Sequence, residues 1–184
     1  MNKDPLSQLT LEPRPYILYN KIQHYAWGAQ GDAAFIPRFL GEEVEPGLPY
    51  AELWMGAHPK ASSEIELDGV RVSLRHLVQL APVEVLGNAV YEKFAGTWPF
   101  LFKVLSVAAP LSIQAHPDKL QAQFLHARDP EHYPDDNHKP EIAIALDSLV
   151  ALVGFKCFSD ILKTLDMYPA VSYTHLTLPT KRIV

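Results

Sequence analysis

Leu111-Ser-Ile-Gln-Ala-His-Pro-Asp-Lys119 says more about the fold of this chain than any other stretch, together with the run Asn137-His-Lys-Pro-Glu141 that follows it. Successive side chains of an extended chain point to opposite faces, so we expect Ser112, Gln114 and His116 to share one face of a strand. The apolar residues between them are then expected to face a core. The first run therefore predicts a strand with three polar groups on the side away from an apolar layer.

The second run predicts a strand of the same kind. Lys139 and Glu141 share a face, and an alternation of alanine with isoleucine or leucine continues to Leu146. Side by side, the two strands would gather an amide oxygen, an imidazole, a carboxylate and an ammonium in one small space. An amide, an imidazole and a carboxylate can hold a divalent metal, although a histidine in an apolar strand is by itself more often a core or surface residue. Without thiolates, manganese, cobalt and iron remain open beside zinc.

Composition restricts the class of protein. The chain has 184 residues, 48% of them hydrophobic, and no apolar run approaches the roughly 20 residues that span a bilayer. Its formal charge of −5 argues against a nucleic-acid-binding or membrane-surface protein, but a phosphorylated substrate needs only a few local cations. Cys157 is the single cysteine and no apolar secretory signal begins the chain, which favours a reducing cytoplasm.

Short elements with stiff connections are expected, since prolines outnumber glycines by 16 to nine. An Asp68-Gly69 turn between two extended runs predicts a hairpin. The expected strands are Tyr16–Ile22, Glu52–Gly56, Ser63–Leu67, Phe100–Val107 and Leu149–Phe155, besides the two above. The expected helices are one capped by Ser73 and ending at Leu80, a short one from Pro82, Lys119–Ala127 capped by Asp118, and Asp160–Met167 capped by Ser159. Many short strands with helices clustered late favour a β-rich sandwich with helical additions.

Several blocks of the sequence together resemble the N-terminal part of type I mannose-6-phosphate isomerases, zinc enzymes with a cupin (jelly-roll) catalytic domain. The blocks occur in order over about residues 16–170, which makes the resemblance more specific than a single motif. They are Asn20–Gly28, Pro49–Lys60, Trp98–Lys103, Pro110–Lys119 and Asp136–Glu141.

The resemblance implies a mainly β fold, a cupin β-sandwich with helical additions that is incomplete because the chain is truncated. Residues 1–157 would be the N-terminal part of the catalytic domain, and residues 158–171 the start of a helical domain. Residues 172–184 no longer resemble the family and look like a translated sequencing-adapter tail, the alternative being a natural polar tail. His175 in that tail is therefore not expected to be a metal ligand.

For the site, the resemblance implies that Gln114, His116 and Glu141 hold one Zn2+ per chain, with a further histidine ligand missing from this chain. Aldose–ketose isomerisation through a cis-enediol also needs a base. Lys139 is the candidate, although pairing with Glu141 or with substrate oxygens would equally explain it. A lysine acts as a base only when its pKa falls well below about 10.4.

Three further residues are expected to contact a sugar phosphate. Trp27 is implied at the active site by the resemblance, and an indole can form a wall against a sugar face, although packing in a core is the usual fate of tryptophan. Ser112 shares the strand face of the ligands, and Lys119 could reach a phosphate or be solvated at a helix start.

Taken together, we expect a zinc-dependent isomerase of mannose 6-phosphate and fructose 6-phosphate that serves GDP-mannose biosynthesis. The full-length form would be a cytoplasmic monomer whose partner is a small sugar phosphate, with no nucleic-acid or membrane partner. We expect the 184-residue chain itself to be poorly folded or inactive, because a jelly roll lacking strands leaves open edges. The alternatives are a non-enzymatic metal- and sugar-binding cupin, an isomerase of another sugar phosphate, or a structural remnant.

Overall fold

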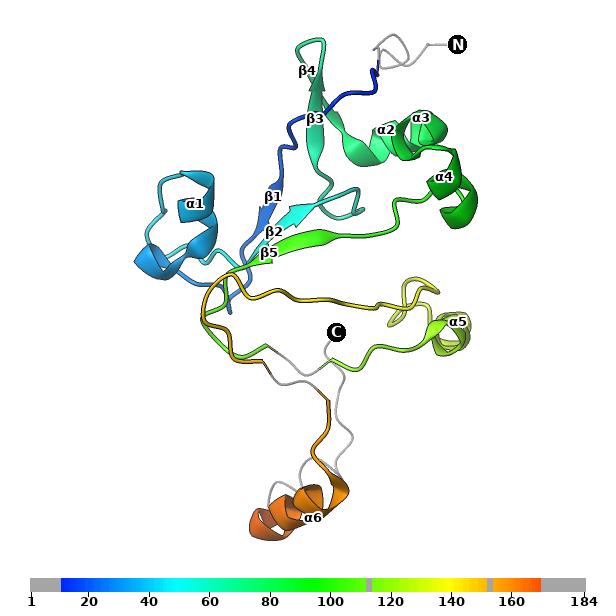
Figure 1. The fold of residues 1–184 in the computed structure, drawn as a ribbon. Helices are drawn as coiled ribbons and strands as arrows, with labels where there is room; N and C mark the ends of the chain where they lie inside the picture. The colour runs from blue at the N-terminus through cyan, green and yellow to red at the C-terminus, as the bar shows by residue number, and fades with distance from the viewer. Residues whose placement is uncertain (1–10, 112–113, 152–153, 170–184) are drawn as a thin grey trace. The chain divides into compact units, whose positions relative to one another are not determined.

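The computed structural model describes residues 11–111, 114–151 and 154–169, and its chain divides into two compact units, Met1–Ser112 and Ile113–Val184 (Figure 1). The domain boundary near residue 157 stays a prediction, and residues 170–184, which include the whole suspected tail, lie outside the described residues. In the described part, no helix has the length and apolarity to cross a membrane.

A three-stranded antiparallel sheet lies at the centre of the first unit. Its strands are β1 (Lys21–Gln23), β2 (Glu52–Met55) and β5 (Phe102–Leu105), in the order β1-β2-β5. Leu53 is opposite Ile22 on one side and Val104 on the other, so one face of the sheet is apolar. The strands predicted around β2 and β5 are confirmed. The first strand begins later than predicted, because Tyr19 makes only an isolated bridge, to Glu64.

The apolar face of this sheet packs in the first hydrophobic core. Leu53 and Ile36 are almost fully buried there, and Ile36 comes from the helix α1 (Phe35–Leu40), which follows the short 3-10 helix η2 (Gly31–Ala33). The other buried members of this cluster are Ala29, Ala34, Tyr50 and Val104. Figure 1 shows α1 beside the three strands.

The loop after β1 approaches β2 closely enough to require a glycine. A Cβ atom at Gly28 would lie 2.6 Å from the backbone nitrogen of Ala51, which is too close for any side chain. The carbonyl of the neighbouring Trp27 accepts a hydrogen bond from the Ala108 N–H at 3.0 Å. These contacts fix the loop that carries Trp27 against the strands.

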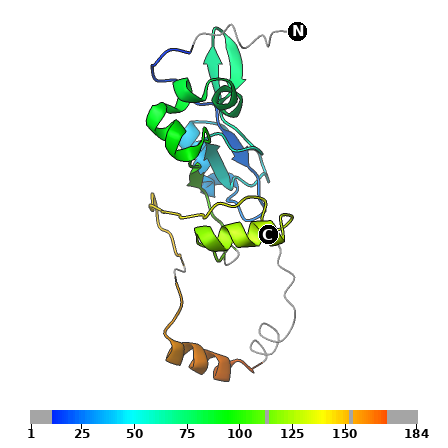
Figure 2. The same ribbon diagram turned by 90° about the vertical axis from the view of Figure 1, so that its right-hand side faces the viewer.

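A β-hairpin forms at the predicted Asp68-Gly69 turn. Its strands are β3 (Glu64–Leu67) and β4 (Val70–Ser73), and both turn residues have positive φ, 50° and 79°, as a type I′ turn requires. Three short helices follow, α2 (Leu74–Leu80), α3 (Pro82–Leu86) and α4 (Asn88–Phe94) (Figure 2). Ile65, Leu67 and Val72 of the hairpin pack with Leu77 of α2 in a second hydrophobic core. Ser73 occupies the N-cap position of α2, but its side chain makes no capping hydrogen bond.

The second unit contains α5 (Lys119–Arg128) and α6 (Phe158–Met167). The predicted cap of α5 is confirmed: the Gln121 N–H donates to Asp118 Oδ1 at 2.8 Å, and the Asp118 N–H donates to Gln121 Oε1 at 3.3 Å. This reciprocal pair is a capping box, which satisfies two backbone donors at once. The predicted cap of α6 is wrong, because Cys157 and not Ser159 holds its N-cap position.

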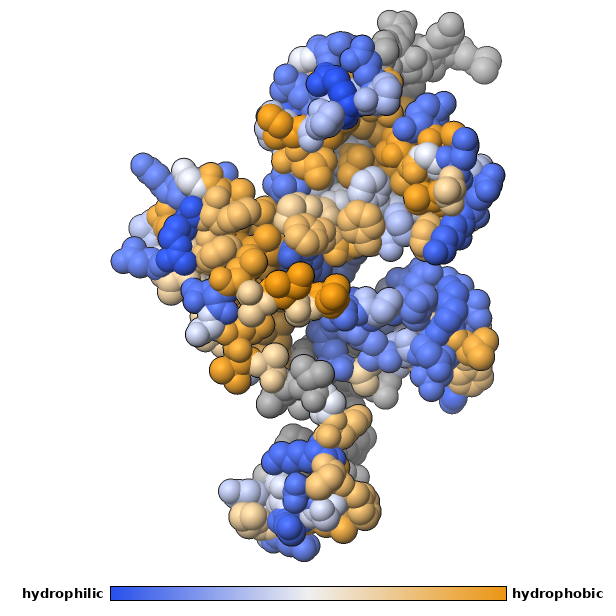
Figure 3. All heavy atoms as spheres, viewed as in Figure 1, coloured by the Kyte–Doolittle hydropathy of each residue, from blue (hydrophilic) through white to orange (hydrophobic). Residues whose placement is uncertain are grey.

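The strands predicted around Gln114, around Glu141 and over Leu149–Phe155 are wrong for the described residues, which are irregular there. Within the part of the chain that the structure describes, no backbone hydrogen bond joins residues 137–151 to another segment. An extended run without a paired neighbour is not part of a sheet, so its apolar side chains do not form a sheet face that packs on a core. Hydrophobic residues accordingly reach the surface (Figure 3), among them Ile142 at 92% exposure.

Helices also occur earlier than expected. Four of them, α1 to α4, precede β5, so the prediction that helices cluster late in the chain is wrong. The described fold is a set of small sheets with helices interspersed among the strands.

Candidate metal centre

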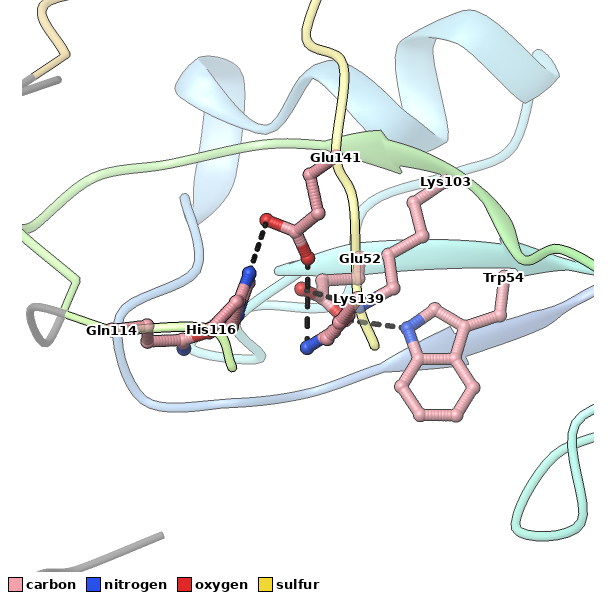
Figure 4. A network of polar contacts seen from close by, with 7 residues as sticks. All are labelled: Glu52, Trp54, Lys103, Gln114, His116, Lys139 and Glu141. Carbon is pink, nitrogen blue, oxygen red and sulfur yellow. Dashed lines mark hydrogen bonds and ion pairs between the residues drawn. The ribbon is translucent and has the colours of Figure 1, made fainter. Parts of the chain in front are cut away.

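Gln114 and His116 lie in the extended segment that leads into the capped start of α5. The two side chains meet, with Gln114 Oε1 and His116 Nε2 3.2 Å apart (Figure 4). Two ligands of a tetrahedral zinc ion at bonds of about 2.0 Å are separated by roughly 3.3 Å. The spacing of these two donors therefore suits a shared metal ion.

Glu141 is in contact with both the imidazole and an ammonium. Its Oε2 lies 4.0 Å from His116 Nδ1, and its Oε1 lies 3.5 Å from Lys139 Nζ (Figure 4). The carboxylate thus faces the ring nitrogen that does not face Gln114, where it can orient the imidazole as outer partners of metal ligands do. The side chains of Lys139 and Glu141 are both 57% exposed, so neither is enclosed by other residues.

By donor type these three groups suit an open zinc site, and Glu141 would have to turn from Nδ1 toward Nε2 of His116 to share an ion with Gln114. An amide oxygen, an imidazole nitrogen and a carboxylate oxygen would give the three protein ligands that a catalytic zinc commonly has, with a fourth position left for water or substrate. Among the described residues, no cluster of three or more histidines, cysteines, aspartates or glutamates could hold a metal. A fourth ligand of these types is therefore not supplied by the described part of the chain.

Lys119 forms hydrogen bonds to the loop that precedes Lys139. Its Nζ donates to the backbone oxygen of Asp136 at 2.9 Å, to Asp136 Oδ2 at 3.2 Å and to Asn137 Oδ1 at 3.2 Å. The hydrogen bond from Lys119 holds the pKa of Asp136 below its ordinary value. An ammonium has three donors, so Lys119 has an acceptor for each before any substrate arrives.

Of the other predicted substrate contacts, only Trp27 can be placed. It lies in the first unit, half-buried, and its ring stacks on Tyr25 with centroids 5.8 Å apart and an interplanar angle of 28°. Ser112 lies outside the described residues.

Sequence reasoning missed a second polar network, on the sheet of the first unit. The Trp54 Nε1–H donates to Glu52 Oε2 at 2.5 Å, and Lys103 Nζ donates to the same oxygen at 3.2 Å (Figure 4). Glu52 is only 7% exposed, and Lys103 lies 5.0 Å over the Trp54 ring. Burial, followed by the Glu52 charge, raises the pKa of Tyr25.

The second network arises from strand pairing. Trp54 on β2 is directly opposite Lys103 on β5, and Glu52 is two residues before Trp54 on the same face. The signal in the sequence was a glutamate and a lysine within two otherwise apolar strands, since a buried charge needs a partner. The network holds an ammonium and a carboxylate in fixed positions on the sheet, each with a partner inside the network.

Comparison with known proteins connects these features to one enzyme family. The family model for the catalytic domain of phosphomannose isomerase type I matches residues 16–158. The mannose-6-phosphate isomerase of Ogataea parapolymorpha is 45% identical over 165 residues, which cover 85% of this chain and 38% of the relative. The human mannose-6-phosphate isomerase is 44% identical over 168 residues, covering 88% and 39%. The chain thus spans about two fifths of the length of these curated relatives.

Solved structures give the same result. Mannose 6-phosphate isomerase from Salmonella typhimurium, bound to its substrate and to zinc, is 42% identical with a TM-score of 0.58, over 66% of this chain and 32% of that one. Two variants of the Salmonella phosphomannose isomerase, with TM-scores of 0.60 and 0.59, replace a glutamate and a lysine by alanine. Those two residues are two positions apart in the Salmonella sequence.

Proposed function

Because the chain belongs to the type I phosphomannose isomerase family, we propose that it is the N-terminal part of a zinc-dependent enzyme that interconverts mannose 6-phosphate and fructose 6-phosphate through a cis-enediol. The observation that carries the proposal is the contact network of Gln114, His116, Glu141 and Lys139, which joins a metal-type donor set to an amine. The similarity to solved isomerases over 66% of the chain supports a cupin fold for the whole protein.

The metal ligands in this proposal are Gln114 Oε1, His116 Nε2 and the carboxylate of Glu141, for one Zn2+ per chain. A further ligand would come from the additional length that the curated relatives have. When bound, zinc would supply Lewis-acid stabilisation of the oxyanion that develops on the substrate. The pair of lysine and glutamate two positions apart in the Salmonella variants supports the choice of Lys139 and Glu141, which have the same spacing.

Lys139 would move the proton between the two reacting carbons. At rest its ammonium is 3.5 Å from Glu141 Oε1. Rotation of Glu141 toward His116 Nε2 removes that partner, so that the Lys139 side chain can face the substrate carbons. As a neutral amine, with its ammonium proton passed to solvent, Lys139 would take a proton from the carbon beside the carbonyl and return it to the former carbonyl carbon. A second proton moves from the hydroxyl oxygen to the carbonyl oxygen at the cis-enediol stage. This is general acid–base catalysis.

Substrate contacts complete the proposal. Trp27 offers an aromatic wall to one face of the sugar, and Ser112 a hydroxyl. Lys119 would bind phosphate by exchanging one of its Asp136 or Asn137 acceptors for a phosphate oxygen. The whole protein would be a monomeric cytoplasmic enzyme whose product feeds GDP-mannose biosynthesis, and we propose that the 184-residue chain alone is inactive.

Zinc titration of the 184-residue chain by calorimetry tests the metal site. We expect one zinc ion per chain, abolished by His116→Ala and retained in His138→Ala, a matched change at the histidine next to Lys139, which makes none of these contacts. Equal loss of zinc in both variants, or no binding by the parent chain, would refute the proposed ligands.

A chimera tests the reaction separately. Residues 16–158 would replace the corresponding region of the Ogataea enzyme, which is 45% identical. We expect the chimera to form fructose 6-phosphate from mannose 6-phosphate in a coupled assay, and Lys139→Met to abolish turnover while zinc stays bound. A chimera that binds zinc and sugar phosphate without turnover would instead support the non-enzymatic binding protein. Steady turnover by the 184-residue chain would contradict its proposed inactivity.

A further inference from the structure

The loop that follows α5 is hydrogen-bonded to that helix at two points. Near the start of the helix, Lys119 donates to Asp136 and Asn137, as described above. Near its end, the half-buried ring of His126 has its Nδ1 atom 2.5 Å from the Tyr133 carbonyl oxygen. A carbonyl oxygen can only accept a hydrogen bond, so this imidazole carries a hydrogen on Nδ1. The proposed chemistry uses neither partner of this second contact.

The spacing of the two contacts shows the course of the loop. Lys119 and His126 are seven residues apart, which is about two helical turns, so they share one face of α5 about 10.5 Å apart along its axis. Their partners Asp136 and Tyr133 are three residues apart, a stretch that covers at most about 10 Å. The loop therefore runs back along α5 in the opposite direction, and it lies beside this helix in both views (Figures 1 and 2).

This course returns the chain to the start of α5, where the candidate metal centre lies. His116 is three residues before Lys119, and Lys139 is two residues after Asn137. The capping box at Asp118 fixes how the segment of His116 enters the helix. Both halves of the candidate metal centre are therefore attached to the same helix.

We propose that α5 is the scaffold of the candidate metal centre and that His126 is a positioning residue. By holding the Tyr133 carbonyl, it sets where Lys139 and Glu141 lie. The ion pair between those two side chains is exposed and contributes little to their order. Because Lys139 and Glu141 have their tasks only in the proposed isomerase, the role of His126 rests on that proposed function.

Substitutions at position 126 separate the hydrogen bond from the bulk of the ring. His126→Ala removes the donor. Asparagine carries its amide nitrogen as many bonds from Cα as the Nδ1 of histidine, so His126→Asn keeps a donor for the carbonyl. Glutamine carries it at the distance of Nε2, so His126→Gln places the donor wrongly. His132→Ala is the control within the loop, because the His132 ring contacts Asp129 at the end of the helix.

Backbone relaxation by nuclear magnetic resonance measures the positioning without zinc or turnover, in the metal-free 184-residue chain. For the amides of residues 138–141 we expect order parameters near 0.85 in the parent chain and below about 0.6 in His126→Ala and His126→Gln. His126→Asn and His132→Ala should keep the parent values. Low order in the parent chain, or unchanged order in His126→Ala, refutes the positioning role and leaves the proposed reaction untouched.

Steady-state kinetics of the chimera measure the consequence for the reaction. We expect His126→Ala to lower kcat about tenfold and to change KM less than about twofold, because a displaced base affects the transition state more than substrate binding. His126→Asn should restore kcat. Equal losses in His126→Ala and His126→Asn, or in His126→Ala and His132→Ala, would indicate general destabilisation and overturn the positioning role. A chimera without any turnover contradicts the proposed function instead, and the order parameters then decide whether His126 holds the loop.

Discussion

Two lysine–glutamate pairs of the same chemistry have opposite settings in this molecule. Lys103 and Glu52 lie 3.2 Å apart across paired strands, with side chains 29% and 9% exposed. Lys139 and Glu141 lie 3.5 Å apart along an irregular segment, both 57% exposed. The first pair is fixed by strand pairing and by the indole of Trp54. The second is held by its own attraction and by the His116 imidazole, which lies 4.0 Å from Glu141.

The difference in burial gives the two lysine–glutamate pairs different roles. Once buried, a charge cannot lose its partner without a large cost, so the first pair is tied to stability. An exposed pair contributes little stability. Its members are therefore available to a metal or a substrate, which is what a reactive site requires.

The largest expected effect comes from breaking the buried pair. Glu52→Ala leaves the Lys103 ammonium and the Trp54 N–H without their acceptor, and we expect the free energy of unfolding in urea to fall by about 3 kcal/mol. The control is Glu66→Ala, which removes the exposed partner of Arg71 on the hairpin and should cost less than about 1 kcal/mol. Similar losses in the two variants would show that the two settings do not differ in energy.

Zinc affinity should show the opposite sensitivity. Glu141→Gln removes the anionic donor while keeping the shape of the side chain, and we expect zinc binding to weaken by about 100-fold. Glu52→Gln should change zinc affinity less than about twofold. Calorimetry on both variants measures the contrast, and a larger effect of Glu52→Gln would place the metal in the other network.

A smaller effect on stability is expected from substitutions at the N-cap positions of α5 and α2. Asp118 caps α5 through a side-chain hydrogen bond, whereas Ser73 holds the same position at α2 without one. Asp118→Ala should therefore destabilise its helix by about 1 kcal/mol, and Ser73→Ala by much less. Hydrogen exchange of the first turn of each helix measures this, and equal loss of protection would contradict the assignment of the cap.

The smallest effect is a dependence on pH at the end of α5. The Nδ1 atom of His132 lies 3.0 Å from both carboxylate oxygens of Asp129. The hydrogen bond between them raises the pKa of His132 above 6.5 and lowers that of Asp129 below 3.8. The stabilisation from this pair is therefore present between the ordinary pKa values of the two groups, 3.8 and 6.5. It is lost as the pH rises through the raised histidine pKa, or falls through the lowered aspartate pKa.

Nuclear magnetic resonance titration of the His132 ring checks this expectation. The midpoint of His132 should lie above the ordinary value of 6.5, and Asp129→Asn should lower it, because the hydrogen bond to Asp129 is the main cause of the raised pKa. A His132 midpoint that does not move in Asp129→Asn would mean that the carboxylate has no influence on the ring.

How much the sequence predicts follows from the range of the interactions involved. The hairpin at Asp68-Gly69 and the cap at Asp118 depend on residues within a few positions, and both are confirmed. The pairing of Glu52 with Lys103 depends on residues 51 positions apart, and no local pattern specifies it. The prediction of strands at Gln114 and Glu141 is wrong for the same reason. Alternation indicates which way each side chain points, but it does not specify a neighbouring strand to pair with.

The site shows a similar division. The contacts of Gln114, His116, Lys139 and Glu141 agree with the grouping that alternation and resemblance predicted. They form without the predicted strands, because the i, i+2 spacing alone brings Gln114 to His116 and Lys139 to Glu141. The roles of these residues stay predictions.

The order of strands in the first sheet has a consequence for the growing polypeptide on the ribosome. β5 pairs with β2 but is made about fifty residues later, after the hairpin and α2 to α4. The hairpin can close within microseconds of leaving the exit tunnel, whereas translation of the intervening residues takes seconds. Throughout that interval Glu52 remains hydrated and Leu53 lacks its partner Val104. The sheet is therefore completed late, when Lys103 emerges and neutralises the Glu52 carboxylate.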